Sequence, residues 1–121
     1  MAVVLIIDDS PTELHLFQNT LEKAGFETLV ADSGEEGLKT AKSARPDCIL
    51  MDVVMPGMNG FQATRKLTKD PTTADIPVIM ITAKDQETDK IWGMRQGAVE
   101  YLVKPVAEKD LVDMINTVVA G

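Results

Sequence analysis

Short apolar runs, many of them rich in β-branched residues, alternate along the chain with amphipathic stretches of helical length. Residues 2–7 (AVVLII) are apolar at every position, which is typical of a strand buried on both faces of a sheet. Four later runs are similar, and each is followed by polar or turn-forming residues. The pattern predicts strands at residues 2–7, 28–31, 48–51, 77–81 and 99–103.

The stretches between these runs carry signals that start and stop helices. Ser10 with Glu13, and Ser33 with Glu36, each match the S-x-x-E capping box. Ala107 is a weak cap for the last helix, because its side chain has no oxygen to accept a backbone N–H. The pattern predicts helices at residues 10–24, 33–43, 61–67, 86–96 and 108–119.

Five strands alternating with five helices indicate an α/β fold, a doubly wound parallel sheet with helices on both faces. A chain of 121 residues is long enough to bury its own core as one domain. We expect residues 1–121 to form that single domain. Because the last helix ends close to Gly121, we expect no output domain.

Charge and composition narrow the function classes. Lys and Arg number 12 and Asp and Glu number 19, so the net charge is 12 − 19 = −7, which argues against nucleic acid or an anionic membrane surface as a partner. With one cysteine and one histidine, an internal disulfide or a Cys- or His-rich metal site is not expected. No apolar run is long enough for a membrane span and no signal peptide is evident, so we expect a cytoplasmic location.

The apolar runs end at a chemically related set of residues. Asp8 and Asp9 come after the first strand, Asp52 after the third, Thr82 after the fourth and Lys104 after the fifth. In a parallel sheet all carboxyl ends meet at one edge, which is where such sheets bind their ligands. Each residue alone is most simply a turn, cap or surface residue, but their joint occurrence predicts a site.

The residue types at this edge favour a particular chemistry. Three carboxylates and one ammonium give about −2 of charge, so we expect a raised carboxyl pKa or a bound cation. Oxygen ligands alone fit Mg²⁺ better than zinc. A carboxylate can also accept a phosphoryl group, and Lys104 and Thr82 suit the oxygens of such a group.

Four motifs carry a family resemblance over nearly the whole chain. They are IIDDSP (6–11), ILMDVVMPGMNG (49–60), VIMITA (78–83) and YLVKP (101–105). In this order and spacing they resemble the CheY-like receiver domain of two-component response regulators, which implies the strand order 2-1-3-4-5. Within that family, SPTE (10–13) and the segments 55–70 and 82–98 look most similar to PilH-type regulators of twitching motility.

The resemblance implies roles for the residues at the strand ends. Asp52 is similar to the phosphoacceptor, and Lys104 to the lysine that pairs with the phosphoryl group. Asp9 matches a direct Mg²⁺ ligand, while Asp8 matches a residue that acts largely through water. Val54 stands where the family uses a backbone carbonyl as a ligand.

Other positions match the switch elements of the family. Thr82 is similar to the hydroxyl drawn toward the phosphoryl group, and Ala83 to the small residue that leaves room for this movement. Tyr101 matches an aromatic side chain that turns inward on activation. The Lys104–Pro105 bond is expected to be cis.

The leading hypothesis is therefore a stand-alone monomeric switch rather than a turnover enzyme. A histidine kinase would supply the phosphoryl group, and slow self-dephosphorylation would remove it. A downstream protein would bind the face formed by the helix at 86–96, the strand at 99–103 and the helix at 108–119.

Several alternatives remain at this stage. The chain could drain phosphate from a sister regulator, or act as a degenerate receiver that only binds. A haloacid-dehalogenase-type phosphatase needs a D-x-D pair, but Val54 stands at the position of the second Asp. A flavodoxin-like redox protein is disfavoured because Asp8 and Asp9 would repel the phosphate of its flavin. The resemblance implies that Val54 and Lys84 occupy positions that tune the lifetime of the phosphoryl group. Trp92 is either a packing residue or part of a partner surface.

Overall fold

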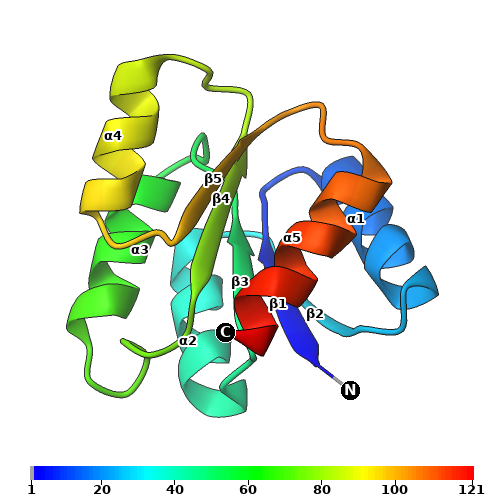
Figure 1. Ribbon diagram of the computed structural model, residues 1–121. Coiled ribbons are helices and arrows are strands. Elements are labelled where there is room, and N and C mark those ends of the chain that lie inside the picture. The colour runs from blue at the N-terminus through cyan, green and yellow to red at the C-terminus, as the bar shows by residue number, and fades with distance from the viewer. Residues whose placement is uncertain (1) are drawn as a thin grey trace.

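A parallel five-stranded sheet with the order β2-β1-β3-β4-β5 forms the centre of the computed structural model, which describes residues 2–121 (Figure 1). The strands are β1 (Val3–Ile7), β2 (Glu27–Ala31), β3 (Cys48–Met51), β4 (Val78–Thr82) and β5 (Glu100–Val103). The helices are α1 (Pro11–Lys23), α2 (Gly34–Ala44), α3 (Gly60–Lys69), α4 (Glu87–Arg95) and α5 (Glu108–Ala120). The predicted fold class and strand order are confirmed.

Helices cover both faces of the sheet. Figure 1 shows α2, α3 and α4 on one side and α1 with α5 on the other. Along β1, Val4 and Ile6 pack into the core cluster shared with α1 and α5, while the alternate residues Leu5 and Ile7 pack into the opposite cluster. All four are at most 1% exposed, which explains why this strand is apolar at every position.

Most element boundaries lie within two residues of their predicted positions, but the capping differs. The Ser10 and Ser33 hydroxyls accept the N–H groups of Glu13 and Glu36, as predicted. The reciprocal half of these capping boxes is missing. At the first helix the N–H of Ser10 donates instead to Asp8 Oδ1.

The complete capping box in the structure lies before α3. Asn59 Oδ1 accepts the N–H of Gln62, and Gln62 Oε1 accepts the N–H of Asn59. These two bonds satisfy backbone donors that a helix start leaves free. The helix therefore begins at Gly60 and ends at Lys69, and it is longer than the predicted 61–67 at both ends.

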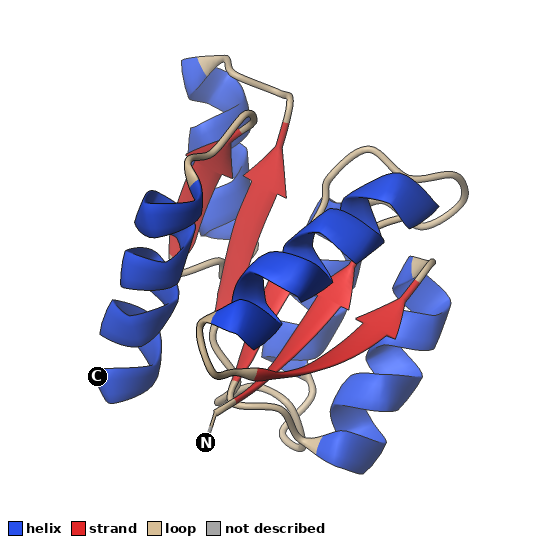
Figure 2. Cartoon of the chain, turned by 90° about the vertical axis from the view of Figure 1, so that its right-hand side faces the viewer, coloured by secondary structure: helices blue, strands red, loops and turns tan. Residues whose placement is uncertain are grey.

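Strand register fixes which residues meet at the edge of the sheet. Ile7 lies opposite Met51, and Thr82 lies opposite Val103. The next residues in the chain, Asp8 and Asp52, therefore leave the sheet side by side, and Lys104 leaves it at the same edge, with β4 between β3 and β5. In Figure 2 the strand arrows point to this common edge. Within residues 2–121, no helix combines the length and the apolar character needed to cross a membrane.

Candidate functional site

Four of the predicted residues come together at the carboxyl ends of the strands. Carboxylate oxygens of Asp8, Asp9 and Asp52 lie within 4.8 Å of one another. Lys104 Nζ lies 3.1 Å from Asp8 Oδ2 and 3.8 Å from Asp52 Oδ1. The Lys104–Pro105 peptide bond is cis, as expected. Segments far apart in the sequence thus build one compact group of charges.

Burial makes these charges costly. Asp8 is 2% exposed and Asp52 is 7% exposed, whereas Asp9 faces solvent. Burial, helped by the charge of Asp8 and opposed by Lys104, raises the pKa of Asp52 to about 6. Burial also disfavours the Lys104 cation, but the nearby carboxylates outweigh it and raise the pKa of Lys104. One ammonium therefore faces a surplus of negative charge.

Hydrogen bonds hold two of the carboxylates and leave ligand atoms free. Asp8 Oδ1 accepts the N–H of Ser10 at 3.0 Å, and Asp52 Oδ1 accepts the N–H of Val53 at 2.9 Å. In the described part of the chain, Asp52 Oδ2 and the carboxylate of Asp9 have no hydrogen-bond partner. Free oxygens beside a net negative charge fit a hard divalent cation such as Mg²⁺.

A short chain of contacts leads from the site to a buried aromatic ring. Thr82 is fully buried, and its Oγ1 accepts the N–H of Lys84 at 3.3 Å. The carbonyl of Lys84 accepts the hydroxyl of Tyr101 at 2.8 Å. Burial, with a contribution from Asp89, raises the pKa of Tyr101 to about 12, so its hydroxyl remains a donor. The backbone of Lys84 therefore links the Thr82 side chain to the Tyr101 ring.

The two remaining predicted positions lie on the surface. Val54 is 59% exposed, and no hydrogen bond to its carbonyl is formed within residues 2–121. Ala83 is also exposed and separates Thr82 from Lys84. Lys84 Nζ lies 3.7 Å from Asp89 Oδ1, so its side chain is directed toward α4.

Sequence reasoning missed three residues that shape the site. Glu13, expected only as a capping residue, has its Oε1 atom 3.7 Å from Lys104 Nζ. The Phe17 ring centroid lies 5.7 Å from the same nitrogen, within cation–π distance. A Cβ at Gly60 would overlap the backbone carbonyl of Asp52 and lie 2.8 Å from Val53 Cα. The adjacent residues Asn59 and Gly60 are turn formers, but nothing in the sequence indicated this close approach.

Exposed apolar side chains gather on α4, β5 and the segments flanking β5. Trp92 is 49% exposed, which favours the surface alternative over simple packing. The other large exposed apolar side chains of this α4–β5 surface are Ile91, Met94, Val99 and Val103.

Comparisons with known proteins agree with this architecture. The family model described as response regulator receiver domain matches residues 4–116. The chain is 58% identical to protein PilH of Pseudomonas aeruginosa over 121 residues, the full length of both. It is 37% identical over 115 residues to the phosphate regulon transcriptional regulatory protein PhoB of the same species, covering 95% of this chain but 50% of PhoB.

A solved structure has the same fold. The Vibrio cholerae chemotaxis protein CheY4 superposes with a TM-score of 0.92 at 35% sequence identity, covering 98% of both chains.

Proposed function

The chain belongs to the response regulator receiver domain family, and from this premise we propose that Asp52 accepts a phosphoryl group from a histidine kinase. The observation that carries the proposal is the convergence of Asp8, Asp9, Asp52 and Lys104 at one sheet edge. The protein is then a phosphorylated switch and not a turnover enzyme.

Asp52 has the geometry of a nucleophile. The Val53 N–H holds Oδ1, and Oδ2 is free to attack phosphorus. The new P–O bond forms as the P–N bond to the kinase histidine breaks, and the electron pair of that bond stays on the imidazole. Lys104 lies close enough to pair with the transferred group, which carries about −1.5 to −2 of charge.

A bound Mg²⁺ would be held by Asp9, Asp52 and the carbonyl of Val54. Asp8 already binds Lys104 and the N–H of Ser10, which favours an outer role for it, through water. The ion supplies positive charge that offsets the repulsion between the carboxylates and the incoming phosphoryl oxygens. The free carboxylate of Asp9 and the raised pKa of Asp52 are the features of this chain that support the assignment.

The conformational readout begins at Thr82. Its oxygen accepts one N–H, and its hydroxyl proton is not donated to any group in residues 2–121, so it can donate to a phosphoryl oxygen. Movement of this hydroxyl would disturb its bond to the N–H of Lys84, whose carbonyl holds Tyr101. Ala83 lies between them and leaves room for the shift. Tyr101 would then transmit it to the α4–β5 surface.

A downstream protein would bind at the α4–β5 surface and the adjoining α5. Exposed apolar side chains such as Trp92 favour a role in protein binding over a simple phosphate drain, because a drain needs no such surface. The similarity to PilH points to a cytoplasmic pathway that controls twitching motility.

Phosphorylation by acetyl phosphate tests the proposal directly. Intact-mass measurement should show one added phosphoryl group in the presence of Mg²⁺, and none with EDTA or in Asp52→Asn. Asp9→Asn should need more Mg²⁺ for the same extent of labelling. Equal labelling of wild type and Asp52→Asn would remove Asp52 from the role.

A further inference from the structure

A second surface, with a positive charge, lies between α2 and α3. A groove of about 950 Å³ runs between α2 and α3, and we call it the α2–α3 groove. None of the strand-end site residues lines it. Its cationic lining residues are Lys42, Arg65, Lys66 and Lys69, and its single acidic lining residue is Asp70.

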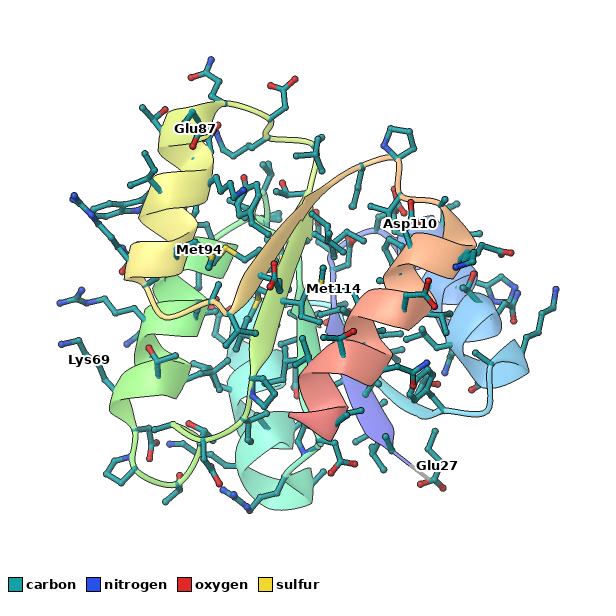
Figure 3. All side chains as sticks on the ribbon, in the orientation of Figure 1. Glu27, Lys69, Glu87, Met94, Asp110 and Met114 are labelled. Carbon is teal, nitrogen blue, oxygen red and sulfur yellow. The ribbon has the colours of Figure 1, made fainter. Side chains whose placement is uncertain are left out.

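The positive charge of this groove is largely uncompensated. Lys42 Nζ lies 3.1 Å from Asp70 Oδ2, so these two charges neutralise each other. Arg65, Lys66 and Lys69 have no hydrogen-bond or ion-pair partner within residues 2–121. Figure 3 shows the side chain of Lys69 extending from α3 away from the sheet.

This charge distribution is unlike that of the other helices. Each of α1, α2, α4 and α5 carries acidic residues, whereas α3 (GFQATRKLTK) carries none, in a chain whose net charge is −7. Arg65 and Lys69 are four residues apart on the helix, a spacing at which like charges repel. Lys66 and Lys69 lie in the last turn of α3, where the helix dipole favours cations, and together with Arg65 they form a local surface for negative charge.

The groove also has an apolar part. Leu38 and Met58 are half-buried among its lining residues. The deepest polar side chain, Thr73, is fully buried and already donates its hydroxyl to the carbonyl of Leu67. The groove therefore lacks the free buried polar groups that orient a small ligand, and it combines charge with apolar contact.

We propose that the α2–α3 groove docks an acidic segment of a partner protein, with an apolar side chain of that segment between Leu38 and Met58. Charge complementarity selects this occupant, because three free cations face solvent in an otherwise acidic molecule. A long nucleic acid would be repelled by the remaining surface. The proposal does not depend on Asp52 or on phosphorylation.

The test uses a fluorescein-labelled peptide of Glu, Asp and Leu, with a control peptide in which Gln and Asn replace the acids. Anisotropy with the full chain in EDTA should show salt-sensitive binding of the acidic peptide only. Amide shifts on titration should centre on Leu38, Met58 and Lys69. The variant Arg65→Glu/Lys66→Glu/Lys69→Glu should weaken binding by roughly tenfold or more.

A matched variant separates local from overall charge. Arg95→Glu/Lys90→Glu/Lys23→Glu changes the net charge equally at exposed positions outside the groove and should bind nearly as wild type. Circular dichroism shows whether the Glu variant is folded. If it is not, a variant with Gln in place of the three groove cations replaces it in the binding measurement. Phosphorylation of the Gln variant by acetyl phosphate should be unchanged.

Four results of the binding experiments would overturn the proposal. They are an equal loss of affinity in both triple variants, amide shifts on another face, no binding of the acidic peptide at low salt, and tighter binding of a short oligonucleotide. Sedimentation measures whether the chain self-associates. If it does, and if the groove substitutions abolish this self-association, the groove binds a second copy of the chain and the proposed occupant is wrong.

Discussion

The strand-end site and the α4–β5 surface lie close together but are built on different physical terms. At the strand ends, Asp8 and Asp52 are buried carboxylates, and the ammonium of Lys104 offsets part of the free energy lost by burying their charges. On α4 and β5 the characteristic side chains are exposed and apolar, and the polar connection is the Tyr101 hydroxyl bond to Lys84.

This contrast explains how a local charge can have a distant effect. A buried electrostatic group responds strongly to one added charge, because nearby charges are poorly screened there. A surface held by packing and one neutral hydrogen bond can rearrange for a few kcal/mol, which is the size of a usual allosteric coupling. We therefore expect substitutions in the first region to have larger effects than those in the second.

The largest effect is expected for Lys104→Ala. This change leaves the buried carboxylate of Asp8 without its partner, which should lower the free energy of unfolding by roughly 3–5 kcal/mol at neutral pH in EDTA. Urea denaturation measures the loss, and Mg²⁺ should restore part of it. Lys109→Ala breaks an exposed Lys–Asp pair of 2.7 Å and should have little effect. If both variants lost the same stability, burial would not be the reason.

Asp52→Asn should raise the free energy of unfolding at neutral pH, whereas Lys104→Ala should lower it. The folded-state pKa of Asp52 is raised from 3.8 to about 6, so the folded protein binds this proton more tightly than the unfolded chain. The ionised group therefore destabilises the protein above pH 6, and Asn should stabilise it by at most about 3 kcal/mol. Unfolding in EDTA across pH measures the gain, which should shrink as pH falls from 6 to 3.8.

Asp70→Asn is a control at a carboxyl group whose pKa is shifted in the opposite direction. Hydrogen bonds from Thr72 and the nearby Lys42 lower the pKa of Asp70 to about 2, so its ionised form stabilises the fold. The substitution should reduce stability at neutral pH and have less effect as pH falls toward 2. A pH-independent gain in Asp52→Asn would show that packing, not ionisation, causes it.

Much of the first region could be predicted from the sequence, because its positions follow from where apolar strands stop. Asp8, Asp52 and Lys104 were placed by that rule alone. The roles of Glu13 and Gly60 could not be predicted, because they depend on distances that the fold sets, from Glu13 to Lys104 and from Gly60 to the backbone of Asp52.

The second region was predicted less completely. The family resemblance indicated which elements form it, but the choice between packing and exposure for Trp92 needed the structure, because α4 has no clear apolar stripe in its sequence. The inward position of the Tyr101 ring, expected on activation, is the one that the structure contains.

Gly93→Ala should alter the second region and spare the first. A Cβ at Gly93 would lie 2.7 Å from Met80 Sδ and 3.1 Å from the Tyr101 ring. Overpacking of this kind costs roughly 1–3 kcal/mol, which outweighs the gain of about 1 kcal/mol from replacing glycine in a helix. Chemical denaturation should show a net loss, with unchanged phosphorylation by acetyl phosphate.

A double-mutant cycle with Tyr101→Ala sharpens this test. If the ring is the group that the new methyl displaces, the loss caused by Gly93→Ala should be smaller when the ring is absent. Additive losses would point to Met80 alone. A net gain of stability in Gly93→Ala would show that the ring moves aside freely.

The smallest effect is expected for Tyr101→Phe, which keeps the buried ring and removes its bond to the Lys84 carbonyl. The loss should be about 0.5–1.5 kcal/mol, the net value of one neutral hydrogen bond. Phosphorylation kinetics should be unchanged, because the hydroxyl bonds a backbone carbonyl and not the carboxylates of the site. Since that carbonyl belongs to the residue whose N–H contacts Thr82, the phosphorylation-induced change in Trp92 fluorescence should be reduced. If stability fell and the fluorescence change remained that of wild type, Tyr101 would be a packing residue only, and the two regions would communicate by another route.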